Sequence, residues 1–175
     1  ILPHAPVMWR VFQTDASLTG ADGLPCIGVW LHGAYVSLSS VDLQARFADV
    51  PPPGADINVW EMFAVVVACR LFAEYMSGKH WRVRTDNASV EAWIMRGVRA
   101  QPVVAGWLAE VMGACMLHKF RLSAKHIPGA ENKVADALSR RNWLEFAECL
   151  SRHWKYWLQF CLVFGLVQFC YQPCE

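Results

Sequence analysis

The chain has 175 residues, of which 55% are hydrophobic and 18% charged, with nine Trp and nine Phe. This composition excludes an intrinsically disordered protein and indicates one folded domain with a sizeable core. Seven scattered cysteines, an odd number without recurrent pairing, favour reduced and mostly buried thiols in an intracellular protein over a disulfide framework. No signal peptide opens the chain, and its start without Met suggests a piece cut from a longer polyprotein.

The net charge of +1 conceals a gradient along the chain. Residues 1–78 hold three Lys and Arg against seven Asp and Glu, whereas residues 79–141 hold eleven against five. The basic middle could face a polyanion, although a solvated surface explains the same charges.

Three short strands are predicted for the first part of the chain. Residues 7–14 (VMWRVFQT) are rich in β-forming residues and predict a strand that ends at Asp15. After a GADGLP turn, residues 26–31 and 35–39 predict two more strands. The two residues between them, 32–33, make a tight link, so a hairpin is expected.

The clearest helix comes after residues 41–56, which contain PPPG and are predicted to be a loop. It spans residues 58–76, with Asn58 as a candidate N-cap and Glu61 in the capping-box position. The Ser-Gly pair at 77–78 ends it.

Strands and helices alternate in the rest of the chain. Residues 81–85 predict a strand, residues 87–95 a short helix and residues 102–118 a longer helix that starts at a proline. Residues 119–127 alternate apolar and polar side chains as a strand does, and residues 130–141 are predicted to be helical. This order predicts an α/β fold with a mixed five-stranded sheet, three strands antiparallel and two parallel, flanked by helices.

Four carboxylates occupy unusual positions in this scheme. Asp15 and Asp86 each follow a predicted strand, and parallel neighbouring strands would bring both to one edge, where open α/β sheets bind ligands. Glu61 takes the first position of the apolar stripe that continues at i+4, i+7 and i+11. Asp136 lies between two alanines, which would let its helix approach another surface closely.

Each acid also has an ordinary structural explanation. Glu61 could complete a capping box, Asp86 could cap the next helix, Asp15 could serve a turn and Asp136 could sit on a helix surface. Converging carboxylates would instead repel one another, and Mg²⁺, which prefers oxygen ligands, would remove that repulsion. Two such ions, about 3.5–4 Å apart, would suit the cleavage of a phosphodiester.

Four segments, in order, resemble the ribonuclease H domain of retroelement reverse transcriptases. They are QTDAS (13–17), INVWEMFAVVVA (57–68), VRTDNASVEAWIMRG (83–97) and HIPGAENKVADALSR (126–140). The last segment resembles the PG-x-x-N-x-x-AD-x-LSR ending of gypsy-like and DIRS-like elements. The IN-x-x-E and DN motifs in the second and third segments are more similar to the DIRS-like group. The resemblance implies a ribonuclease H-like domain at 9–141, after a linker at 1–8 from a preceding reverse transcriptase region.

By motif, the resemblance implies that Asp15, Glu61, Asp86 and Asp136 are catalytic ligands of two Mg²⁺ ions, with Mn²⁺ as a possible substitute. It implies hydrolysis of the RNA strand of RNA–DNA hybrids during retrotransposon reverse transcription. The polymerase portion of the same polyprotein would be a partner, and no membrane is expected. The alternatives are an inactive structural or nucleic-acid-binding module of this fold and a different nuclease of the superfamily.

Two sets of residues are candidates for contact with the substrate. The first set is Ser17, Asn87 and Asn132. These residues could contact the substrate or neighbouring site residues, or they could instead serve in turns and helix caps. The second set is Arg96, Arg99, Lys125, Arg140 and Arg141. These residues could contact phosphates, which positions a duplex without reading its sequence, or they could instead belong to a solvated surface.

The chain departs from the family pattern at two points. Many relatives carry a mobile His after the Pro-Gly turn, whereas this turn reads GAEN; His126 precedes it within a strand, which implies a structural role and slower turnover. A Lys/Arg-rich extra helix is also missing, which implies weak binding by the isolated domain. Residues 142–175 lie outside the resemblance and form an apolar tail. A helix packed on this domain and the start of a further domain are favoured over a membrane-surface segment for this tail. Its apolar run is short for a bilayer span, and its His and Cys residues lack the spacing of a zinc site.

Overall fold

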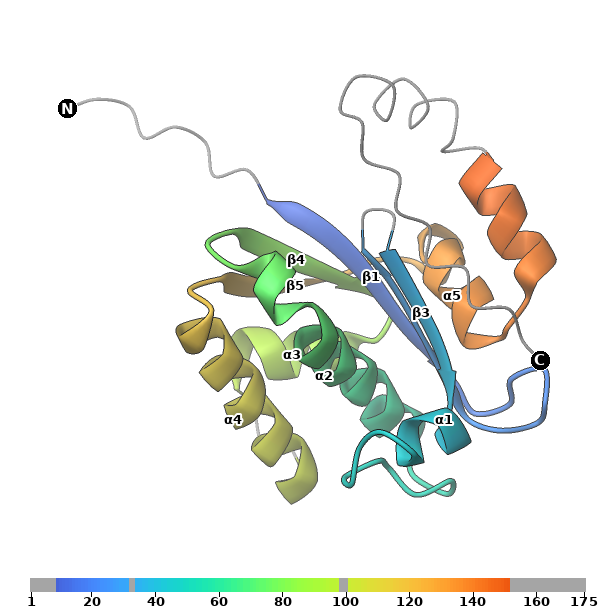
Figure 1. The fold of residues 1–175 in the computed structure, drawn as a ribbon, viewed down its shortest axis with the longest axis horizontal. Coiled ribbons are helices and arrows are strands. Elements are labelled where there is room, and N and C mark those ends of the chain that lie inside the picture. Colours follow the sequence, from blue (N-terminus) through green and yellow to red (C-terminus); the bar gives the residue numbers. More distant parts are fainter. Residues whose placement is uncertain (1–8, 32–33, 98–100, 152–175) are drawn as a thin grey trace.

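A computed structural model describes residues 9–31, 34–97 and 101–151 of the chain. Its centre is a five-stranded sheet with the strand order β3-β2-β1-β4-β5 (Figure 1). The strands are β1 (Arg10–Ser17), β2 (Cys26–Leu31), β3 (Ala34–Ser39), β4 (His80–Thr85) and β5 (Arg121–His126). β1, β2 and β3 pair antiparallel, while β4 is parallel to both β1 and β5. The predicted mixed sheet is therefore confirmed.

Helices cover both faces of this sheet (Figure 1). They are α1 (Ser40–Gln44), α2 (Ile57–Met76), α3 (Ala88–Arg96), α4 (Pro102–Leu117) and α5 (Lys133–Ser139). Figure 1 shows α2, α3 and α4 on one face, with α5 on the other. Residues 143–151 are also helical and pack beside α5, and no helix in the described parts of the chain is long and apolar enough to cross a bilayer.

The core is built around α2, whose residues 59–69 are all buried. It packs against β1 and β2 on one side and against α4 on the other, where the rings of Phe63 and Trp107 lie 5.0 Å apart between centroids. Arg70 joins the same two helices through Glu110 at 2.6 Å. Because α2 is enclosed in this way, its side chains are held in fixed places, and Glu61 is one of them.

The first strand extends further towards its C-terminal end than the sequence predicted. β1 runs three residues past the predicted end at position 14, so Asp15 lies inside the strand and not after it. The extension follows from pairing, since β2 continues the ladder to the Ser17–Cys26 pair. The predicted start of the strand at residues 7–8 and the tight link at residues 32–33 lie outside the described residues.

Two other predictions at helix ends are wrong. The predicted loop at 41–56 begins with α1, because Ser39 and Asp42 form a capping box in which each side chain bonds the other's backbone N–H. The N-cap of α2 is Asp56, which accepts from the N–H of Asn58, so Glu61 does not complete a capping box.

The last predicted helix is divided. Residues 130–141 were expected to form one helix, but a 3-10 turn at Gly129–Glu131 precedes α5, and Asn132 separates the two. The remaining boundaries agree with the predicted ones within two residues. The predicted end of α2 at Ser77 is confirmed, whereas the N-cap of α3 is Asn87 and not Asp86, the residue considered as a cap.

Close approach of α5 to the sheet depends on Gly28 in β2. A β-carbon at this position would lie 2.6 Å from the backbone N of Ser139 and 2.8 Å from the β-carbon of Leu138, and it would also overlap the carbonyl oxygen of Ala135. Only glycine fits there, and it lies directly across the β1–β2 ladder from Asp15. The contact therefore fixes how near α5 comes to that carboxylate.

Gly28→Ala should destabilise the fold, because the new methyl group would meet backbone atoms of α5 that cannot rotate away. We expect a loss of about 1–3 kcal/mol in the free energy of unfolding, measured by urea denaturation. Gly113→Ala in α4 is the matched control, since a β-carbon there meets open space and should be neutral or stabilise by up to about 1 kcal/mol. Equal stability of the two variants would contradict this account of the α5 contact.

Candidate metal centre

Three carboxylates from distant parts of the sequence meet at one edge of the sheet. Asp15 lies in β1, Glu61 in α2 and Asp86 immediately after β4, and one oxygen of each lies within 4.8 Å of the others. β1 and β4 are parallel neighbours, so the chain brings Asp15 and Asp86 to the same edge. Asp15 is 4% exposed and Glu61 5% exposed, while Asp86 is half-buried.

Burial of these groups opposes their ionisation. Burial raises the pKa of Asp15 to about 7 against the lowering effect of a hydrogen bond from Ser139, and the charge of Asp86 adds to the rise. Burial and then the charges of Asp15 and Asp86 raise the pKa of Glu61 well above its ordinary value, with a partial offset from the N–H of Ala16. The arrangement is therefore costly unless protons or cations neutralise it.

A divalent cation fits this set of ligands. All three side chains offer carboxylate oxygens, which Mg²⁺ and Mn²⁺ prefer, and the Oε2 atom of Glu61 is buried without a hydrogen-bond partner. No ion pair found among the described residues involves Asp15, Glu61 or Asp86. Neutralisation of these carboxylates is therefore left to protons or to a bound cation.

Asp136, the fourth predicted ligand, lies beside this group and is not part of it. Its side chain is 31% exposed, and its Oδ1 atom accepts a hydrogen bond of 2.6 Å from Arg140, the C-cap residue of α5. Its charge contributes to the raised pKa of both Asp15 and Glu61. Asp136 is therefore within electrostatic reach of Asp15 and Glu61, and its role as a ligand stays a prediction.

The closing segment of the fold supplies hydrogen bonds to the carboxylates. Asn132 is completely buried, and its Nδ2 atom lies 3.0 Å from the carbonyl oxygen of Thr14, 3.1 Å from Asp86 Oδ1 and 3.5 Å from Asp15 Oδ1. The hydroxyl of Ser139 donates to Asp15 Oδ2. Of the two alternatives considered for Asn132, contact with neighbouring site residues is the one that the structure shows.

Ser139 is the site residue that sequence reasoning missed. The available signal was its place in ADALSR, three residues after Asp136 and on a helix whose small residues allow close approach. Its contact with Asp15 joins residues 124 positions apart, so no local pattern could reveal it.

Ser17 and Asn87 take part in turn and cap chemistry, the other alternative considered for them. The N–H of Thr19 donates to Ser17 Oγ at 3.3 Å. Asn87 caps α3 by accepting from two backbone N–H groups, and its Nδ2 atom donates to Asn58 at 2.8 Å. Their contact with a substrate stays a prediction.

The basic candidates divide into three groups. Arg96, Lys125 and Arg140 are exposed, whereas Arg99 lies outside the described residues. The guanidinium of Arg141 is occupied by ion pairs with two aspartates, so it does not offer the free phosphate contact that was predicted.

His126 lies at the end of β5 beside the carboxylate group. Its backbone N–H donates to Glu91, and its Nε2 atom lies 3.1 Å from the backbone oxygen of Asp86. The ring thus contacts the chain next to the site.

No protein-family model and no curated protein matches the sequence. Among solved structures, the chain is similar to RNase H1 of the halophilic archaeon Halobacterium salinarum, at 19% identity and a TM-score of 0.56 over 75% of this chain and 94% of that one. It is similar to LC11 RNase H1 in complex with an RNA/DNA hybrid, at 21% identity and a TM-score of 0.53 over 73% and 91% of the two chains. The prototype foamy virus protease–reverse transcriptase matches at 14% identity and a TM-score of 0.50, over 79% of this chain and 21% of that one.

These similarities establish the fold. The chain has the ribonuclease H fold, as the sequence resemblance implied, with the mixed sheet and flanking helices in place.

Asp15→Asn should stabilise the cation-free protein, and more so as pH rises. Because the folded pKa is about 7 against 3.8 ordinarily, the folded state binds the extra proton between about pH 4 and 7, and stability falls as pH rises through that window. We expect Asp15→Asn to exceed the wild type by on the order of 3 kcal/mol at pH 8 in a chelator, and by less near pH 4, in urea unfolding.

Asp49→Asn is the control of opposite sign. Hydrogen bonds from Arg70 lower the pKa of Asp49 to about 2, so its ionised form stabilises the fold above about pH 4 and that contribution is lost as pH falls towards 2. At pH 8 this variant should be less stable than the wild type. A gain from Asp15→Asn that does not change with pH would show that burial of the Asp15 charge is not its cause.

Proposed function

We propose that the chain is a metal-dependent ribonuclease H that hydrolyses the RNA strand of RNA–DNA hybrids during reverse transcription of a retroelement. The observation that carries the proposal is the convergence of Asp15, Glu61 and Asp86, two of them buried, with an unpartnered oxygen on Glu61. The ribonuclease H fold supports it, as does the sequence resemblance of the four segments that contain the acids.

The three converging carboxylates would hold the cations, two Mg²⁺ ions by the family pattern, and Asp136 would be the fourth acid. Bound cations would supply Lewis-acid stabilisation of the scissile phosphate and activation of water at neutral pH. The chain's own residues keep the ligands in place: Glu61 is buried on the enclosed helix α2, and Asn132 contacts both Asp15 and Asp86. Ser139 fixes the second oxygen of Asp15.

The substrate is proposed to be a hybrid duplex held by its backbone. Arg96 on α3 and Lys125 on β5 are exposed cations that could neutralise phosphates without reading the base sequence. Arg140 after α5 is also exposed, although its Nε atom pairs with Asp136. LC11 RNase H1, which is similar to this chain, is in complex with an RNA/DNA hybrid. The chain matches about a fifth of the foamy virus protease–reverse transcriptase, so a polymerase portion is proposed as its partner.

Cleavage of a labelled RNA–DNA hybrid in Mg²⁺ tests this proposal. Glu61→Gln and Asp86→Asn should each lower kcat at least about 100-fold, because each removes a charge that holds the cation. Fluorescence anisotropy with the same hybrid should show little change in binding, since neither residue belongs to the exposed basic set. Glu74→Gln is the matched control on α2, where the side chain is exposed, and it should leave cleavage unchanged.

Two results would favour the alternatives. A wild-type chain that binds the hybrid but cuts nothing in Mg²⁺ or Mn²⁺ would favour an inactive binding module. Equal cleavage of duplex DNA and hybrid would favour a different nuclease of the same superfamily.

A further inference from the structure

The turn that ends α5 has an unusual residue at its centre. The N–H of Arg141 donates to the carbonyl of Leu138 at 3.2 Å and the N–H of Asn142 to that of Ala137 at 2.8 Å, the two bonds of a Schellman motif. Arg141 has φ +54°, the left-handed conformation that glycine usually supplies at this position. The Arg141 side chain makes a contact that glycine could not make.

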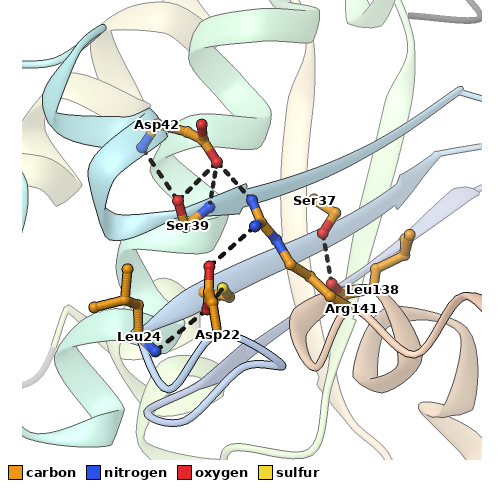
Figure 2. Close-up of polar contacts among 8 residues, drawn as sticks. Asp22, Leu24, Ser37, Ser39, Asp42, Leu138 and Arg141 are labelled. Atoms are coloured by element: carbon orange, nitrogen blue, oxygen red, sulfur yellow. Dashed lines mark hydrogen bonds and ion pairs between the residues drawn. The ribbon is translucent and has the colours of Figure 1, made fainter. Parts of the chain in front are cut away.

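That contact is a clasp formed by Arg141 with Asp22 and Asp42 (Figure 2). Nη1 lies 3.1 Å from Asp22 in the β1–β2 turn, and Nη2 lies 2.6 Å from Asp42 in α1. The same Asp42 oxygen accepts from the backbone N–H and the hydroxyl of Ser39, at 2.9 and 2.7 Å. The clasp therefore connects the end of α5 to Asp42, whose carboxylate is already fixed by the hydrogen bonds from Ser39.

The charge of Asp42 suits this role. Burial raises its pKa, but the hydrogen bonds from Ser39 and the Arg141 guanidinium outweigh burial and lower the pKa below its ordinary value. Asp42 is thus ionised at neutral pH and pairs with Arg141 throughout the range in which the protein would act.

The residues on both sides of Ser139 in the sequence, Leu138 and Arg141, make contacts that hold the end of α5. On one side, the hydroxyl of Ser37 in β3 donates to the carbonyl of Leu138 at 2.7 Å (Figure 2). On the other side is Arg141, two residues later. These contacts hold the turn against the sheet, and from that turn the Ser139 hydroxyl reaches Asp15 Oδ2.

We propose that Arg141 is a positioning residue of the metal centre. The clasp holds the last turn of α5 so that Ser139 orients the carboxylate of Asp15 towards Glu61 and Asp86. This inference rests on the proposed cation site, and it assigns to Arg141 an effect on that site without contact with substrate or cation.

The chain contains a matched control for the backbone. Lys119 follows α4 with the same φ of +54°, and its turn has the same two bonds, from Lys119 N to Met116 O at 3.4 Å and from Phe120 N to Cys115 O at 3.1 Å. Its side chain is exposed. Arg141→Gly and Lys119→Gly relieve the same backbone conformation, but only the first removes the clasp.

Titration with Mn²⁺ without nucleic acid, by isothermal calorimetry, tests the proposal directly. Arg141→Gly should weaken Mn²⁺ binding by about tenfold, the effect typical of residues that orient a metal ligand. Cleavage of the hybrid should show a similar fall in kcat with an unchanged KM. Lys119→Gly should match the wild type in both measurements.

A double-mutant cycle separates positioning from general stabilisation. Ser139→Ala should also weaken Mn²⁺ binding, and adding Arg141→Gly to it should cause no further loss, because Arg141 acts through the Ser139 hydroxyl. A purely structural clasp would instead lower affinity by the same factor in both backgrounds. That result, or unchanged Mn²⁺ affinity in Arg141→Gly, would overturn the proposal.

Failure of this inference is distinguishable from failure of the proposed function. A chain that binds Mn²⁺ with the expected coupling but does not cut hybrids would refute the nuclease and leave the clasp's role intact. If Arg141→Gly does not fold, Asp22→Asn cuts one arm of the clasp and leaves the capping box of α1 in place. The same two outcomes then decide the question.

Discussion

The repulsion among Asp15, Glu61 and Asp86 is the constraint on which the rest of this structure depends. Two of the three carboxylates are almost completely buried, and their oxygens lie within 4.8 Å of those of the third. Such a cluster tends to push its members apart or towards water. The fold resists by placing each acid on an element that cannot easily move: a central strand, an enclosed helix and the end of a strand paired on both sides.

The closing segment completes the site from the opposite face of the sheet. The sheet and α2 supply the acids, while Asn132 and Ser139 supply donors that fix the orientation of the carboxylates. This division requires α5 to lie unusually close to β2, which the absence of a side chain at Gly28 permits. The position of α5 therefore determines both its packing on β2 and the hydrogen bonds that it makes to the site.

Sequence reasoning succeeded where the signal was local. Strand patterns, the long apolar helix and the positions of Asp15, Glu61 and Asp86 relative to them were enough to bring those acids to one edge. Helix α1 was not predicted, because the nearby PPPG stretch favours a loop. The capping pair Ser39 and Asp42 was the available sequence signal for this helix. Contacts across more than a hundred residues, such as Ser139 with Asp15, depend on how α5 docks and leave no local pattern.

The burial that opposes ionisation of the three carboxylates would also influence which cations the proposed site binds. Burial raises the pKa of Asp15 to about 7 and raises that of Glu61 well above its ordinary value, so protons compete with a cation for these carboxylates. A divalent cation has a stronger Coulomb attraction to several carboxylates in a poorly solvated site than a monovalent cation has, so it competes better with protons. Under the proposed function, burial of the cluster would therefore favour compact divalent ions over the monovalent ions of the surrounding solution.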